Sequence, residues 1–91
     1  MAEKKNVVIF ELAPDLGLKP LELVKLLAKL GITVERQRGS HAQLRGIYRG
    51  EMRFTTIPMH MGEELPNGIL LAVLKDCGIK REEFEKMLRG K

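Results

Sequence analysis

Three short strand-like runs joined by tight turns restrict the fold of this chain more than any other feature. The runs are ITVERQ (32–37), HAQLRGIY (41–48) and EMRFTTIP (51–58). Each alternates side chains between two faces, as a half-buried strand does. Gly39-Ser40 and Arg49-Gly50 supply the turns, and Pro58 ends the ladder because it cannot donate a backbone hydrogen bond. Strands joined by such short turns pair antiparallel, so the sequence predicts a three-stranded antiparallel sheet.

Regions of helical periodicity flank these strands. On the N-terminal side we expect a helix that begins at Pro20 and is capped by Gly31, because Leu and Val recur between them at helical spacing. On the C-terminal side, ILLAVLKDC (69–77) stops at Gly78, and IKREEFEKML (79–88) has acidic residues first, as the helix dipole favours. Helices segregated from an antiparallel sheet define an α+β fold, with the helices on one face of the sheet.

The first 19 residues are predicted to extend a domain formed by residues 20–91. Within them NVVIFEL (6–12) is rich in β-branched residues, which predicts an extra edge strand that could mediate homo-oligomerisation. The chain start resembles neither a signal peptide nor a membrane span, so no membrane partner is expected. Cys77 is the only cysteine, which excludes an internal disulfide, and we expect a cytoplasmic protein.

Positive charge concentrates in the middle of the chain. The net charge is +4, and the middle third holds five arginines against two glutamates. The arginines are Arg36, Arg38, Arg45, Arg49 and Arg53. Arginine offers a planar fork of donors that fits phosphate oxygens, whereas lysine is a point charge. A solvated strand face is the commoner explanation of such a run, but its all-arginine composition beside a histidine favours an anionic or nucleic-acid partner.

The predicted register brings both histidines of the chain to one end of a hairpin. If the second and third strands pair around Arg49-Gly50, His41 faces Pro58 and His60 lies just beyond it. The Gly39-Ser40 turn returns to the same end and brings the arginines of the first strand with it. The register therefore predicts a cluster of histidines and arginines at one edge of the sheet.

This cluster contains the groups that RNA cleavage requires. RNA carries its own nucleophile, the 2′-hydroxyl, so cleavage needs a base, an acid for the departing 5′-oxygen, and positive charge at the phosphate. Histidine can serve as acid or base, and arginines supply the charge, so no metal or other cofactor is needed. The acid/base candidates are His41 and His60, and the candidates for RNA binding are Arg36, Arg38, Gly39, Ser40 and Arg45.

Simpler explanations exist for the same residues. A histidine after Gly-Ser at a strand start is more often a surface or turn residue, and the same holds for His60 in its loop. Cys77 is expected to be a small buried apolar group rather than a nucleophile, because it follows a predicted core position and precedes Gly78. These alternatives leave His41 as the residue on which a catalytic interpretation depends.

The string LVKLLAKLGITVERQRGSHAQLR, with TTIPMHMGEELPNGILLAVLKDCGIKREEFEKML further on, resembles the HicA toxin family, also called YcfA-like. The resemblance covers about residues 20–88. RQRGSH (36–41) combined with IPMH (57–60) and LKDCGIKREEF (74–84) makes it specific. It implies a double-stranded-RNA-binding-domain-like fold and an mRNA interferase, which is an endoribonuclease toxin. It also implies a HicB-type antitoxin partner, and it maps the family's catalytic histidine onto His41.

The chain departs from the family pattern at residues 1–19, at the entry to the first helix and at the second hairpin turn. An alternative function is a non-catalytic RNA-binding module of the same fold, which would bind duplex RNA through shape and phosphate contacts. A protein-interaction domain with an acidic partner is a third. The RNA cleavage preference and the assignment of acid and base between the two histidines stay open at the sequence level.

Overall fold

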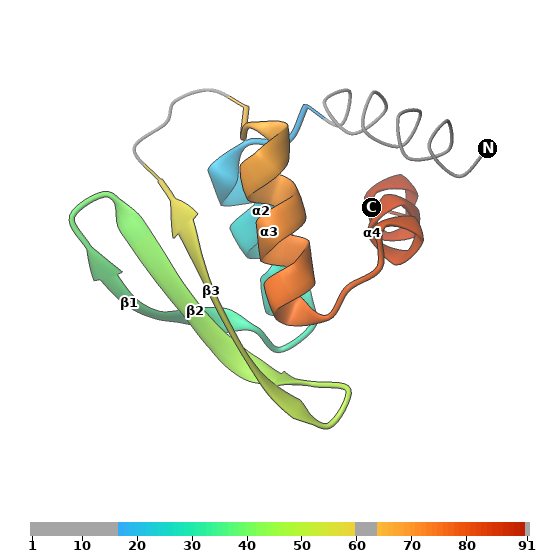
Figure 1. The fold of residues 1–91 in the computed structure, drawn as a ribbon, viewed down its shortest axis with the longest axis horizontal. Helices are drawn as coiled ribbons and strands as arrows, with labels where there is room; N and C mark the ends of the chain where they lie inside the picture. The colour runs from blue at the N-terminus through green and yellow to red at the C-terminus, as the bar shows by residue number, and fades with distance from the viewer. Residues whose placement is uncertain (1–16, 60–63, 91) are drawn as a thin grey trace.

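The computed structural model describes residues 17–59 and 64–90, and this part of the chain has an α+β fold. The elements in chain order are α2 (Pro20–Lys29), β1 (Thr33–Arg38), β2 (His41–Tyr48), β3 (Glu51–Pro58), α3 (Asn67–Cys77) and α4 (Arg81–Arg89). Figure 1 shows α2 and α3 against one face of the three-stranded sheet, with α4 beyond α3. This confirms the predicted helix, antiparallel sheet and helices of a double-stranded-RNA-binding-domain-like fold. The strand predicted at 6–12 lies outside the described residues.

The helix ends follow from local chemistry. α2 begins at Pro20 as predicted, and Glu22 accepts a hydrogen bond from the Lys19 backbone N–H at 2.9 Å. A glutamate at this third helical position satisfies a backbone donor even though Lys19 offers no side-chain cap. Gly31 follows α2 with φ +91°, and Gly78 ends α3 with φ +69°, so both predicted stop signals use the left-handed region that glycine tolerates. α3 begins two residues before the predicted start.

The register of the sheet agrees with the prediction. The strand order is β1-β2-β3, and His41 pairs with Pro58 while Tyr48 pairs with Glu51. At the turn between β2 and β3, Arg49 and Gly50 both have positive φ, at +57° and +78°. Two successive left-handed residues are the requirement of a type I′ turn, which matches the twist of the flanking strands. The short connection therefore fixes which residues of β2 and β3 share a face.

The simple alternation predicted for the first strand was wrong. Val34 pairs with Leu44, but the register then shifts, so that Arg36 pairs with Gln43. Glu35 is the extra residue of a β-bulge, which reverses the facing of every residue that follows it in β1. Val34 and the later Gln37 therefore lie on the same face, whereas strict alternation predicts opposite faces.

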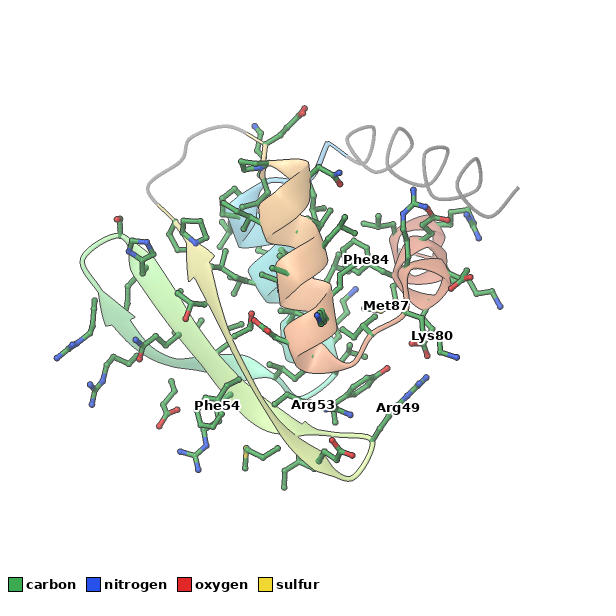
Figure 2. All side chains as sticks on the ribbon, viewed as in Figure 1. Arg49, Arg53, Phe54, Lys80, Phe84 and Met87 are labelled. Carbon is green, nitrogen blue, oxygen red and sulfur yellow. The ribbon has the colours of Figure 1, made fainter. Side chains whose placement is uncertain are left out.

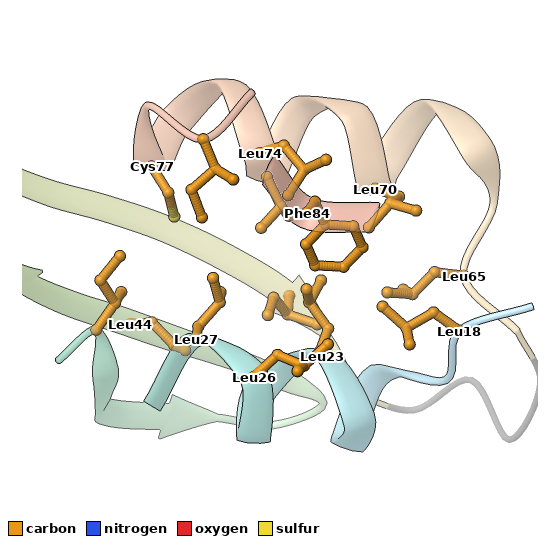
Figure 3. Close-up of a cluster of buried hydrophobic side chains, with 14 of the residues drawn as sticks. Leu18, Leu23, Leu26, Leu27, Leu44, Leu65, Leu70, Leu74, Cys77 and Phe84 are labelled. Atoms are coloured by element: carbon orange, nitrogen blue, oxygen red, sulfur yellow. The ribbon is translucent and has the colours of Figure 1, made fainter. Parts of the chain in front are cut away.

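The hydrophobic core lies between the sheet and the helices (Figure 3). It joins leucines of α2 and α3 to the inward side chains of β2 and β3, and Phe84 of α4 is fully buried within it. Leu18 is also buried, and its carbonyl accepts a hydrogen bond from Leu65 N–H at 2.7 Å, so the segment before α2 contributes to the core. Cys77 has no exposed surface, which confirms its packing role. Within the described ranges no helix is long and apolar enough to cross a membrane.

Candidate functional site

Among residues 17–59 and 64–90, no helix packs on one of the two faces of the sheet. On β2, Ala42 and Leu44 are fully buried beneath the helices, whereas His41, Gln43 and Arg45 alternate with them and are exposed. Directly paired residues of neighbouring strands share a face, so the exposed partners of these three residues face outward with them. We call this surface the open face. Its members are Thr33, Arg36, Arg38, His41, Gln43, Arg45, Phe54 and Thr56. In Figure 2 Phe54 projects from the sheet on the side away from the helices.

The open face brings together most of the residues singled out from the sequence. Arg38 is the direct cross-strand partner of His41, and Arg36 pairs with Gln43 one step further along. The bulge at Glu35 is responsible, because without it the alternation that points Val34 towards the helices would point Arg36 the same way. Arg45 lies on β2 two residues beyond Gln43. Three arginines and one histidine therefore occupy adjacent strands on one surface.

The turn before His41 forms the end of this surface. Gly39 has φ +56°, the left-handed conformation that glycine adopts at the first position of a type II′ hairpin turn. The Met59 backbone N–H donates a hydrogen bond to the Ser40 carbonyl, so the chain leaves β3 beside the Gly39-Ser40 turn. His60 follows Met59 in the sequence but lies outside the described residues, so its predicted position beside His41 stays a prediction.

The other two arginines of the central segment have internal partners. Arg53 donates from Nε to the Tyr48 carbonyl at 3.1 Å, and only 17% of its side chain is exposed. Arg49 forms an ion pair with Glu83 of α4 and lies against the Tyr48 ring, 5.3 Å from its centroid. Figure 2 shows both side chains at the end of the hairpin near α3 and α4. Arg49 therefore connects the hairpin to α4 and Arg53 forms its bonds within the hairpin, whereas the three arginines on the open face point outward.

Arg45 lies at the centre of contacts that the sequence did not reveal. Its guanidinium carbon lies 5.1 Å from the centroid of the Phe54 ring, within the range of a cation–π interaction. Its Nη1 also lies 3.3 Å from Oε2 of Glu35, in a pair of which about half is exposed. The alternation of Met52, Phe54 and Thr56 along β3 was visible in the sequence. It did not show which set faces the helices, so Phe54 was missed.

A shallow depression crosses this part of the sheet. Its volume is about 430 Å³, and it is lined by Glu35, Gln43, Phe54, Thr55, Thr56 and Asp76. Asp76 of α3 closes it at the edge of β3, where its carboxylate accepts a hydrogen bond from the Thr55 hydroxyl at 3.0 Å. The remaining polar lining groups, on Glu35, Gln43 and Thr56, belong to residues that are exposed to solvent. The depression therefore offers one aromatic surface beside hydrogen-bonding groups.

Other chemically reactive groups add little to this surface. Burial raises the pKa of the Cys77 thiol to about 11, with a further contribution from the nearby Asp76 carboxylate, so the thiol stays protonated near neutral pH. No three His, Cys, Asp or Glu side chains of the described ranges converge as ligands for a metal ion. The open face itself presents arginine, histidine and neutral polar groups, with the Phe54 ring and the Glu35 carboxylate beside Arg45.

A small α+β domain of double-stranded-RNA-binding-domain-like fold, with a basic sheet face, is the class that these observations define. Residues 21–79 match the family model described as the HicA toxin of bacterial toxin–antitoxin. Because the match spans well over half of the chain, the protein belongs to the HicA toxin family. It is accordingly a toxin of a toxin–antitoxin pair, and membership implies an antitoxin partner and an RNA target in general terms. No curated protein matches the chain.

Proposed function

We propose that this toxin is an endoribonuclease that cleaves mRNA without a metal ion, with His41 as an acid/base group. The observation that carries the proposal is the direct pairing of His41 with Arg38 on the open face, beside Arg36 and a glycine turn. A phosphate held by these arginines would lie next to the imidazole. The family membership supports an RNA target, and the geometry supports a reaction at that phosphate.

The proposed reaction uses the 2′-hydroxyl of the RNA itself. A base removes the 2′-hydroxyl proton as the O2′–P bond forms and the P–O5′ bond breaks, and an acid returns a proton to the departing 5′-oxygen. The products are a 2′,3′-cyclic phosphate and a 5′-hydroxyl end. His41 serves as one of these two groups, and His60 is the candidate for the other. Arg36, Arg38 and Arg45 bind the phosphates and stabilise the charge that develops on them. The Gly39-Ser40 turn lets the backbone approach the RNA closely.

The test is incubation of the purified full chain with end-labelled single-stranded RNA in the presence of EDTA. The wild type should cleave the RNA, and His41→Ala should lower the rate by about 100-fold or more while melting at the wild-type temperature. Lys75→Ala, an exposed change on α3, is the matched control and should cleave normally. Full activity of His41→Ala would remove this residue from the mechanism. Binding of RNA by the wild type without cleavage would support the non-catalytic RNA-binding alternative instead.

The partner and the location follow from the same proposal. A HicB-type antitoxin would neutralise the toxin by covering the open face, because that surface holds the proposed catalytic group. mRNA is a cytoplasmic substrate, so the protein would act in the cytoplasm. His41→Ala should still bind the antitoxin, since the substitution keeps the arginines and Phe54 of that surface.

A further inference from the structure

The depression beside Arg45 has the wrong charge for a phosphate. Two of its lining groups are the carboxylates of Glu35 and Asp76, and none of the described residues that line it is an arginine or lysine. If the phosphates of an RNA strand lie on Arg36 and Arg38, the group of the RNA that enters this depression is therefore not a phosphate. The neutral part of a nucleotide that carries hydrogen-bond donors is the base.

An aromatic surface is available there for the base. Phe54 is 56% exposed although it is a large apolar side chain, and it lies beside Arg45. Proteins that bind single-stranded RNA stack bases on such exposed rings and on arginine planes. Gln43 is two residues from His41 on the same face, about 7 Å along the strand, which is within reach of a nucleotide next to the one being cleaved.

We propose that this depression is a base-recognition site that selects adenine or cytosine over uracil next to the cleaved bond. Adenine and cytosine each present an exocyclic amino group beside an unprotonated ring nitrogen. The amino group would donate to the Glu35 carboxylate, and the ring nitrogen would accept from the Gln43 amide or the Thr56 hydroxyl. Uracil presents carbonyl oxygens around its single N–H, so it would place an acceptor against the carboxylate.

Glu35 is well placed for this role. Its pair with Arg45 is half exposed, and such surface pairs contribute little free energy, so the carboxylate can turn to a base at low cost. The pair also keeps the carboxylate over the open face when no RNA is bound. Glu35 faces outward by plain alternation from Val34, and the bulge turns Arg36 outward directly after it, so a base-recognition group and a phosphate-binding group adjoin on the open face.

This inference rests on the proposed RNA-cleaving function, and its experiment separates the two. The full chain carrying His41→Ala, which prevents cleavage, is titrated with fluorescent oligo(A), oligo(C) and oligo(U) of about 12 nucleotides, a length within the range of single-strand sites. Fluorescence anisotropy gives the dissociation constants. Oligo(A) and oligo(C) should bind about fivefold or more tightly than oligo(U). Equal affinity for all three would overturn the proposal.

Two substitutions in that background identify the groups responsible. Glu35→Gln should remove most of the preference while strengthening binding overall, because it deletes a negative charge and releases Arg45. Phe54→Ala should weaken binding of all three oligonucleotides by about fivefold or more, and Phe54→Tyr should restore it. Lys75→Ala is the control that should change neither property. A preference unchanged in Glu35→Gln, or wild-type affinity in Phe54→Ala, would overturn the site.

The remaining outcomes assign failure to one proposal or the other. If the wild type cleaves RNA but the oligonucleotides bind without preference, base recognition fails and the proposed function stands. If a base preference dependent on Glu35 is found but the wild type does not cleave RNA, the site stands and the catalytic proposal fails. If Phe54→Ala loses only antitoxin binding, the ring belongs to a protein interface and the site is wrong.

Discussion

At the scale of single residues, the five arginines of the central segment divide into two groups that the sequence could not separate. Arg49 and Arg53 form their bonds at the turn end of the β2–β3 hairpin, whereas Arg36, Arg38 and Arg45 project from the open face, Arg45 in a half-exposed pair with Glu35. The division depends on the bulge in β1 and on the packing of α4, and neither was visible in local spacing. The charge count therefore predicted a negatively charged partner, but it did not show which surface of the protein would bind that partner.

Gly46 is a residue whose role is set by close packing. A Cβ atom at this position would lie 2.0 Å from the Gly31 carbonyl oxygen and 2.7 Å from the Ile32 Cα, both backbone atoms that cannot move away cheaply. We expect Gly46→Ala to lower the free energy of unfolding by about 2 kcal/mol or more, measured by urea denaturation.

Gly68→Ala is the matched control for this prediction. It lies in the first turn of α3, and an added Cβ would meet no atom within 4 Å. Alanine should leave stability unchanged or raise it by up to about 1 kcal/mol through its higher helix propensity. Equal effects of the two substitutions would show that the contact between β2 and the start of β1 is not tight.

The buried Cys77 thiol is expected to make the free energy of unfolding depend on pH. Its pKa rises from 9.0 to about 11 on folding because burial disfavours the thiolate. Between these values the unfolded chain loses the thiol proton and the folded chain keeps it, so this group destabilises the fold as the pH rises from about 9 to 11. Cys77→Ala should be less stable at pH 8, but the difference from wild type should shrink by pH 11. Parallel stability curves of the two proteins would contradict the prediction.

At the scale of elements, the tight turns made the sheet predictable. Gly39 and Gly50 marked the two hairpins, and the resulting register of β2 with β3 is confirmed to the residue. β1 was less predictable because a bulge changes facing without leaving a signature in composition. The sequence predicted a tight turn at Arg49-Gly50, but the positive φ of Arg49 became apparent only in the structure.

The contact between the β2–β3 turn and α4 is expected to contribute a small but measurable free energy to stability. Arg49 and Glu83 form an ion pair, with side chains 51% and 27% exposed. Arg49→Asn removes the charge while keeping a residue that tolerates positive φ. Combined with Glu83→Gln in a double-mutant cycle, it should give a coupling energy of about 0.5 kcal/mol that decreases with added salt. A coupling of zero at low salt would show that the pair does not connect hairpin and helix in solution.

At the scale of the whole molecule, the two faces of the sheet differ in their surroundings. One face holds the core between strands and helices, and the other presents three arginines, His41 and Phe54 to solvent. The membership in the HicA family was predictable because the residues of the Gly-Ser-His turn and of α3 are contiguous motifs. The base-recognition surface was not, because it joins Glu35, Phe54 and Asp76, which lie far apart in the sequence.

The separation of charge predicts how RNA binding depends on salt. If Arg36, Arg38 and Arg45 each neutralise one phosphate, the logarithm of the association constant should fall with the logarithm of salt concentration with a slope of about −2. Arg38→Ala should make this slope shallower by about 0.7. Arg89→Ala, at the exposed end of α4, should leave it unchanged. Equal effects of both substitutions would indicate that RNA does not bind the open face.

The bare side of the sheet also has a genetic consequence. Arg36, Arg38 and His41 are absent from the buried core, so if they act as proposed, a point mutation at one of them would inactivate the toxin without unfolding it. Survivors of a toxicity selection should therefore carry substitutions concentrated at outward positions of β1 and the start of β2. Their products should accumulate to normal levels, and those altered only at His41 should still sequester the antitoxin and so compete for it with an intact toxin.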